Sequence, residues 1–169
     1  VLADMRRLPF RKRFDLVIAA DDPFVHLTRE EDRHQALAEA AAHLKAAGSF
    51  LLDAFWLPKG KLRRARRSGY EKKRTPDPEG AQPLRIEEEW ECETDRPLCR
   101  ASYRYRRGEE VILESGFAGR LWTEEEIRDR FPRVGLQPIR FYGSYAGEPW
   151  DPGSSDHLIV EAGKQGRRP

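Results

Sequence analysis

Several features are scarce or absent in this chain of 169 residues. It contains no asparagine, one methionine and two cysteines. Cys92 and Cys99 are too few for a disulfide framework or a four-cysteine zinc site. The apolar run from Leu16 to Ala20 is far shorter than a membrane-spanning helix, and the first residues show no secretory signal pattern. We therefore expect a cytoplasmic protein in which both cysteines are reduced.

The composition still allows a folded domain. Hydrophobic residues make up 38% of the chain and charged residues 36%, which is enough apolar material for one core and excludes wholesale disorder. The lack of asparagine and the single methionine fit a thermophile-like source, although a GC-rich genome predicts the same bias.

Positive charge is concentrated in one segment. Lys59 to Arg74 holds nine basic residues and one acid, although the net charge of the chain is only +2. The surrounding stretch from Pro58 to Pro83 is rich in proline and glycine and weakly periodic, which predicts a mobile surface loop with one helical turn near Leu62 to Arg67. It could attract an anionic substrate, bind nucleic-acid phosphates or simply be solvated. Tyr70 is its sole aromatic residue, which disfavours base stacking.

The N-terminal third predicts an α/β unit. The apolar run Phe14 to Ala20 is typical of a strand buried on both faces of a parallel sheet. A capping box at Thr28 predicts a helix start, Gly48 a helix C-cap, and Ser49 to Phe55 a second buried strand. The predicted buried stripe consists of Leu37, Ala40, Ala41 and Leu44. A strand, a helix and a strand in this order favour a parallel pair.

The segment from Leu84 to Trp122 alternates polar and apolar residues with period two, which predicts an antiparallel sheet. A hairpin turn at Asp95-Arg96 would bring residues from the two flanking strands opposite each other. The predicted pairs are Cys92 with Cys99, Glu91 with Arg100, and Glu87 with Arg104. A third strand is expected from Val111 to Leu121.

The C-terminal part predicts one helix and two strands. A second capping box, Thr123 to Glu126, opens a helix that should stop near Pro132. Gln137 to Tyr145 and His157 to Ala162 should form an antiparallel pair.

An ordered series of segments resembles class I S-adenosylmethionine-dependent methyltransferases. The segments are ADMRRLPF (Ala3–Phe10), FDLVIAADDPFVHLT (Phe14–Thr28), HLKAAGSFLLD (His43–Asp53), RLWTEEEI (Arg120–Ile127) and VGLQP (Val134–Pro138). The resemblance implies an α/β, Rossmann-like sheet with an inserted antiparallel β-sheet. Such a sheet is found in the small-molecule N-methyltransferase branch, where it helps to cover the substrate or forms a dimer contact.

The resemblance divides the chain into five parts. Residues 1–57 would be a partial Rossmann-like core, 58–83 the basic loop, 84–122 the inserted sheet, 123–162 the helix and strand pair that complete the core, and 163–169 a tail. The family's glycine-rich cofactor turn has no counterpart, so we expect this chain to be the C-terminal two-thirds of such an enzyme. Phe14 to Ala20 would then lie at a sheet edge unless another strand or a partner covers it.

The resemblance also suggests site residues. Asp4 and Met5 match positions that contact the adenine of S-adenosylmethionine. Ala19, Ala20 and Asp21 would lie beside its methionine part, because ligands of open α/β sheets bind beyond the carboxyl ends of the strands. These residues would equally suit an ordinary turn and strand end.

The acceptor side is expected to include Asp22, Phe24 and Trp56, with Asp53 and Phe55 as further lining candidates. His26 could act as a base near neutral pH or simply line the pocket. No spacing of His, Cys, Asp or Glu predicts a metal site.

Together these features predict methyl transfer from S-adenosylmethionine to a nitrogen or oxygen of a small molecule by in-line displacement, without a membrane partner. The basic segment leaves open an anionic acceptor. Two alternatives stay open. The chain could be a non-catalytic binding module that lacks the cofactor half, or it could bind or modify nucleic acid through residues 59–74. A homodimer through the inserted sheet is also expected from the resemblance.

Overall fold

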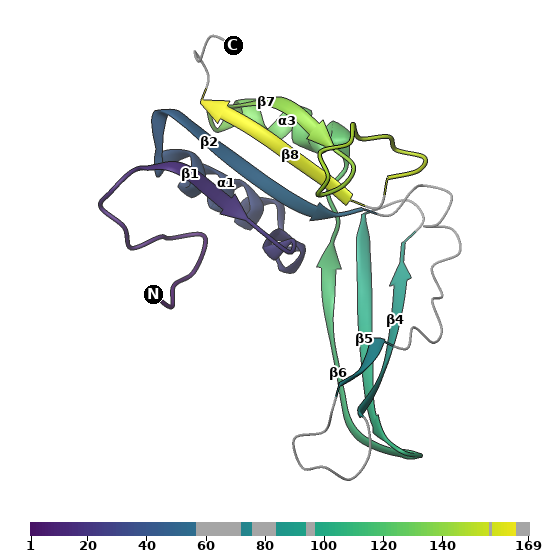
Figure 1. Cartoon of the computed structure of the whole chain (residues 1–169). Coiled ribbons are helices and arrows are strands. Elements are labelled where there is room, and N and C mark those ends of the chain that lie inside the picture. The colour runs from purple at the N-terminus through teal and green to yellow at the C-terminus, as the bar shows by residue number, and fades with distance from the viewer. Residues whose placement is uncertain (57–71, 76–83, 94–96, 156, 165–169) are drawn as a thin grey trace. The chain divides into compact units, whose positions relative to one another are not determined.

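The computed structural model describes residues 1–56, 72–75, 84–93, 97–155 and 157–164 (Figure 1). The chain divides into two compact units. The α/β unit comprises Val1–Pro58 and Arg120–Pro169, and the antiparallel unit comprises Lys59–Gly119. Within the described ranges, no helix is long and apolar enough to cross a membrane.

The α/β unit is built on a four-stranded sheet in the order β1-β2-β8-β7 (Figure 1). The strands are β1 (Phe14–Ala19), β2 (Leu44–Phe55), β7 (Leu136–Tyr142) and β8 (His157–Lys164). β1 and β2 are parallel, whereas β8 is antiparallel to both of its neighbours. These pairings confirm the predicted parallel pair and the predicted antiparallel pair at the C-terminus.

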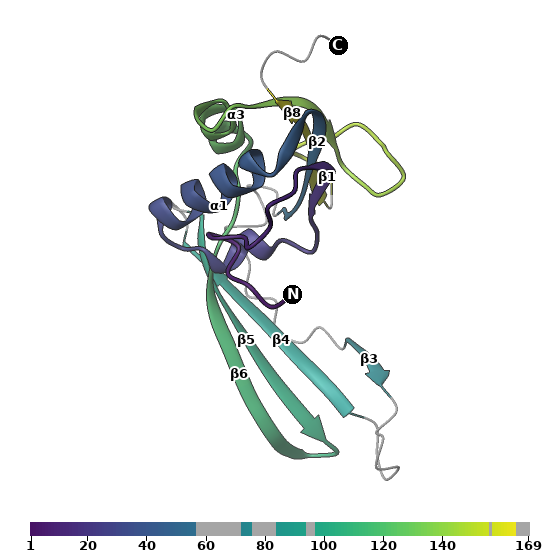
Figure 2. The same cartoon turned by 90° about the vertical axis from the view of Figure 1, so that its left-hand side faces the viewer.

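Helices cover one face of this sheet. The short 3-10 helix η1 (Pro23–His26) is followed by α1 (Glu30–Ala42), and α3 (Glu124–Arg133) precedes β7. α1 and α3 lie on the same side of the strands (Figure 2). Their side chains form one core with the facing side of the sheet, in which Leu37, Leu44, Leu52, Ile127, Leu136 and Leu158 are completely buried. The apolar periodicity therefore identified the core face correctly.

The predicted start of α3 is confirmed, because the Thr123 hydroxyl oxygen accepts the Glu126 N–H at 3.1 Å. The predicted start of α1 at Thr28 is wrong. The helix begins at Glu30 with Arg29 as its N-cap, and no side-chain cap is formed. The Arg33 guanidinium, which lies 3.3 Å from the Phe24 carbonyl oxygen and 3.5 Å from that of Leu27, holds the preceding segment outside the helix.

Gly48 is not a helix cap either. α1 ends at Ala42, and Gly48 lies inside β2, which begins at Leu44. A Cβ at Gly48 would lie 2.9 Å from the carbonyl oxygen of Phe14 on the neighbouring strand. The glycine is thus explained by the close approach of two strands.

β1 occupies an edge of the described sheet, as expected for a strand without a further neighbour. The prediction that it is buried on both faces is wrong for the described residues. Val17 and Ala19 pack against the core, but Leu16 and Ile18 are 48% and 57% exposed. β1 therefore carries more apolar side chains than its half-exposed position in the described sheet requires.

The antiparallel unit is a four-stranded sheet in the order β3-β4-β5-β6. The strands are β3 (Lys72–Thr75), β4 (Leu84–Cys92), β5 (Leu98–Arg107) and β6 (Glu110–Arg120, whose last residue belongs to the α/β unit). The register confirms all three predicted pairs: Cys92 with Cys99, Glu91 with Arg100, and Glu87 with Arg104. The register that follows from a two-residue loop at Asp95-Arg96 is therefore the observed one.

Two features of this unit differ from expectation. Cys92 and Cys99 are joined by a disulfide, with 4.0 Å between their Cα atoms, so the expectation of reduced thiols is wrong. β3 is a strand inside the segment that was expected to be a loop, and it pairs with β4. The remainder of Pro58 to Pro83, including the expected helical turn, lies outside the described residues, as does most of the 163–169 tail.

Candidate functional site

The turn that follows β1 has an unusual backbone. Asp21 and Asp22 are consecutive residues with positive φ angles of 58° and 43°. Such left-handed conformations are costly for non-glycine residues and are retained where the surrounding structure enforces them, often at functional sites. This turn lies at the carboxyl end of β1, where ligands of parallel sheets bind.

Asp22 is 4% exposed although it carries a carboxylate. Its Oδ2 atom accepts the Phe55 N–H at 3.0 Å. Its Oδ1 atom is buried and has no hydrogen-bond partner among the described residues. Burial raises the pKa of this carboxyl to about 6, against the opposing effects of the Phe55 N–H and the Arg33 guanidinium. This carboxyl therefore holds one buried acceptor oxygen without a partner, and it gains or loses a proton near pH 6.

The carboxylate of Asp53, on β2, contacts groups from three other segments. Its Oδ2 atom accepts the Asp21 N–H at 3.2 Å and the Tyr145 hydroxyl at 2.6 Å. Its Oδ1 atom lies 3.6 Å from Nδ1 of His157 at the start of β8. The Tyr145 and His157 rings are 4.6 Å apart. The bond to Asp53 raises the pKa of the Tyr145 hydroxyl to about 12, so the phenol stays a donor at neutral pH.

Tyr145 and His157 also line a hollow of about 550 Å³ formed by the connection between β7 and β8. Tyr145 was not predicted to be a site residue, and His157 was predicted only to start a strand. The Tyr145–Asp53 contact spans 92 residues, and no local spacing indicates it. Asp53 itself was a candidate because it closes an apolar strand.

The residues expected near the adenine lie in the segment before β1. Asp4 forms an ion pair with Arg6 at 2.7 Å, and this partner lowers the pKa of the Asp4 carboxyl to about 2. Arg6 also pairs with Asp32 of α1 at 2.7 Å. Met5 packs against the core of the α/β unit. No described hydrogen bond or ion pair joins this segment to the Asp21–Asp22 turn.

The other predicted residues divide between core and surface. Phe24 is buried in the core of the α/β unit, and its ring centroid lies 5.7 Å from that of Trp122. Trp56 is also buried, with its ring 5.1 Å from that of Trp150. Ala19 is buried, whereas Ala20 and His26 are exposed. The structure thus brings the Asp21–Asp22 turn into direct hydrogen-bond contact with Asp53, and it places His26 at an exposed position at the end of η1.

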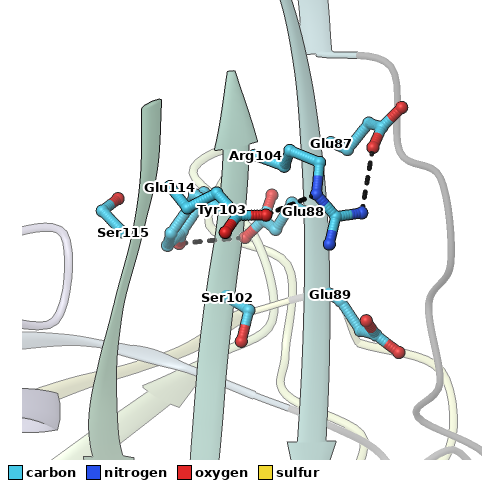
Figure 3. Close-up of a pocket in the computed structure, with 8 residues that line it drawn as sticks. All are labelled: Glu87, Glu88, Glu89, Ser102, Tyr103, Arg104, Glu114 and Ser115. Carbon is cyan, nitrogen blue, oxygen red and sulfur yellow. Dashed lines mark hydrogen bonds and ion pairs between the residues drawn. The ribbon is translucent and has the colours of Figure 1, made fainter. Parts of the chain in front are cut away.

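The antiparallel unit contains a separate hollow of about 460 Å³ (Figure 3). It is lined by Glu87, Glu88, Glu89, Ser102, Tyr103, Arg104, Glu114 and Ser115. Arg104 donates to Glu114 at 2.8 Å and to Glu87 at 3.5 Å, and the Tyr103 hydroxyl donates to Glu88 at 3.1 Å. These carboxylates are already engaged by neighbouring side chains. In the described ranges, no three His, Cys, Asp or Glu side chains are placed to hold a metal ion.

The strand-end residues suit a cationic ligand with hydroxyl or amino groups, as S-adenosylmethionine is. Ala19 and Ala20 leave little side-chain bulk at the end of β1. Asp21 is exposed and can present its carboxylate. The chemistry of these residues is therefore compatible with that group.

No protein-family model and no curated protein sequence matches this chain. Several solved structures, in contrast, are similar to this chain. An S-adenosylmethionine-dependent methyltransferase from Clostridium acetobutylicum has a TM-score of 0.77 at 16% identity, over 98% of this chain and 64% of its own. The CcbJ methyltransferase from Streptomyces caelestis has a TM-score of 0.73 at 16% identity, over 97% of this chain and 62% of its own.

The sugar N-methyltransferase KedS8 from Streptoalloteichus has a TM-score of 0.66 at 15% identity, over 96% of this chain and 60% of its own. The chain therefore spans less than two-thirds of the length of each of these proteins. The chain has the fold of S-adenosylmethionine-dependent methyltransferases.

Proposed function

We propose that the protein containing this chain transfers a methyl group from S-adenosylmethionine to a nitrogen or oxygen of a small molecule. The cofactor supplies a methyl group that is already activated on a sulfonium, so positioning of the acceptor is the main task of the protein. The fold likeness supports the reaction class. The sugar N-methyltransferase among the similar structures favours nitrogen as the acceptor atom.

The observation that carries the proposal is the buried Asp22 carboxylate at the carboxyl end of β1. This oxygen is buried and has no hydrogen-bond partner, and a small movement of the turn would let it bind an ammonium or hydroxyl group of the acceptor. A carboxyl whose pKa lies near 6 can also take up the proton that an amine loses when it is methylated. Asp22 is therefore our first candidate for an acceptor-binding residue, with Trp56 and Phe24 supporting it.

The other predicted roles remain part of the proposal. Asp4 and Met5 would face the adenine, and Ala19, Ala20 and Asp21 the methionine part of the cofactor. For Asp4 to do so, its carboxylate must share or release Arg6. His26 is an alternative base to Asp22.

We also propose that the four-stranded sheet of the α/β unit is part of a larger sheet. β1 is an edge strand whose apolar side chains are half-exposed, and the similar structures are longer than this chain. We propose that further strands of the complete protein pair with β1 and bring the glycine-rich cofactor turn to the strand ends. The sheet of the antiparallel unit would then be the inserted part.

The test uses the complete protein and calorimetric titration with S-adenosylhomocysteine, followed by mass spectrometry of candidate amines after incubation with S-adenosylmethionine. We expect binding and addition of one methyl group. The Asp22→Asn variant should bind S-adenosylhomocysteine with affinity near that of the wild type but lose most methyl transfer. Asp15→Asn, at the opposite end of the same strand, is the matched control. Absence of binding by the complete protein would leave the binding-module alternative.

Two partner proposals can be tested in parallel. Val111, Ile112 and Leu113 are exposed apolar residues on the edge strand β6, which makes this sheet a candidate contact for a homodimer. Light scattering should then give twice the monomer mass, and Ile112→Lys should reduce it. Nucleic-acid binding would instead show a steep salt dependence that is lost when Arg63, Arg64, Arg66 and Arg67 are replaced.

A further inference from the structure

The Asp21–Asp22 turn is tied to the end of β2 by three hydrogen bonds. The Asp53 carbonyl oxygen accepts the Asp22 N–H at 3.0 Å, and Asp53 Oδ2 accepts the Asp21 N–H at 3.2 Å. In the opposite direction, the Phe55 N–H donates to Asp22 Oδ2 at 3.0 Å. Asp53 thus binds both strained residues of the turn, once through its backbone and once through its side chain.

Asp53 is itself held in place from the other side. The Tyr145 hydroxyl donates to the same Oδ2 atom, and His157 lies beside Oδ1. The Asp53 side chain is 14% exposed, so its rotamer is restricted by these neighbours. A carboxylate oxygen that accepts two donors from different segments has little freedom to move.

We propose that Asp53 is a positioning residue. By accepting the N–H groups of Asp21 and Asp22, it holds the left-handed turn and thereby sets the place of the Asp22 carboxylate. Tyr145 keeps the Asp53 side chain in the orientation that this requires. The consequence for methyl transfer rests on the proposed function, whereas the consequence for the turn does not.

The test is amide hydrogen exchange of the complete protein without ligands. The diagnostic amide is that of Phe55, because its acceptor, Asp22, is unchanged in every variant. We expect Asp53→Ala to speed Phe55 exchange by about tenfold, the size expected for the loss of one hydrogen bond to a charged group. Asp53→Asn keeps a side-chain oxygen that can accept the Asp21 N–H and should retain most of the protection.

Two controls separate positioning from general weakening. The Leu51 amide, also on β2, should keep its exchange rate in Asp53→Ala. Asp15→Ala removes an exposed carboxylate that pairs with Lys45 across β1 and β2, and it should leave Phe55 unaffected. The proposal is overturned if Phe55 protection is unchanged in Asp53→Ala, if Leu51 loses protection equally, or if Asp53→Asn behaves like Asp53→Ala.

The kinetic readout follows from the same geometry. Displacing a group by about 1 Å can lower a rate by roughly 100-fold. We therefore expect Asp53→Ala to lower kcat strongly while the affinity for S-adenosylhomocysteine changes little, and Asp53→Asn to restore part of kcat. If the wild-type protein neither binds nor transfers, the proposed function fails, but the exchange experiment still decides whether Asp53 positions the turn.

Discussion

The two units of this chain stabilise their sheets in different ways. In the α/β unit, helices α1 and α3 cover one face of the sheet, and many large apolar side chains are completely buried. In the antiparallel unit, the buried hydrophobic residues within the described ranges are Trp90, Cys99 and Ala101. Its strands are joined by cross-strand ion pairs, an aromatic group and a disulfide. The α/β unit thus depends on the burial of apolar side chains, whereas the antiparallel unit depends on interactions between side chains of neighbouring strands.

This contrast has consequences for function. A packed core can keep a costly group such as the buried Asp22 in place, because the surrounding contacts outweigh the cost. A sheet held by exposed charge pairs has fewer means to do so. The α/β unit accordingly contains the left-handed turn, the buried and unpartnered Oδ1 of Asp22 and the buried Arg33.

The largest expected effect is on core packing. Leu52→Ala removes a completely buried side chain of β2 and should lower the free energy of unfolding by about 2–5 kcal/mol. Leu113→Ala, on the exposed β6 of the other unit, should change it by no more than about 0.5 kcal/mol. Urea unfolding of both variants measures the difference. Equal losses would show that the two units share one mode of stabilisation.

The second effect depends on pH. Because the pKa of Asp22 is about 6 in the folded protein and 3.8 for an unperturbed aspartate, the folded state binds more protons between these values. This carboxyl therefore lowers stability as pH rises from about 4 to 6, by at most roughly 3 kcal/mol. Asp22→Asn should lack that decrease. Parallel unfolding profiles of wild type and variant between pH 4 and 7 would contradict the buried, ionising carboxyl.

The third effect is specific to the antiparallel unit. The Cys92–Cys99 disulfide closes a short loop, and reduction should cost about 2–3 kcal/mol by the loop-entropy model. Hydrogen exchange after mild reduction should show faster exchange in β4 and β5 and little change in β2. A thiol assay of the unreduced protein should find neither cysteine free, and two reactive thiols would refute the disulfide.

The smallest effect concerns charge pairing. Arg104, on the inner strand β5 of the antiparallel unit, contacts Glu87 and Glu114. Since all three side chains are substantially solvated, Arg104→Ala should shift the unfolding midpoint only slightly. The shift should disappear at about 1 M salt, where the screening length is near 3 Å. A shift that persists in high salt would indicate packing of the arginine stem instead.

Much of the fold could be predicted from local patterns. The β4–β5 register could be predicted because a two-residue loop at Asp95-Arg96 would set Cys92 opposite Cys99, and the charge alternation then places Glu91 opposite Arg100. Thr123 marked the start of α3 because its spacing to Glu126 suits a cap. The start of α1 was mispredicted because the buried Arg33 binds carbonyl oxygens of the preceding segment, an interaction that has no signature at Thr28.

The site could be predicted only in part. Asp21 and Asp22 were identified because they close an apolar strand, and Asp53 because it lies near the end of another. Their contacts with one another, and with Tyr145 and His157, depend on how the strands assemble and on a left-handed backbone. Neither is encoded in a short window of sequence. The disulfide was missed because two cysteines opposite each other can be reduced or oxidised with the same register.

The strand order of the α/β unit also affects folding of the chain during translation. β8 is the last strand in the sequence, yet it lies between β2 and β7. During translation at about 5–20 residues per second, β2 would leave the ribosome roughly 5–20 s before β8 can join it. Until then, one long edge of β2 has no partner and is open to wrong pairing or chaperone binding. A nonsense mutation before His157 would make that vulnerable state permanent.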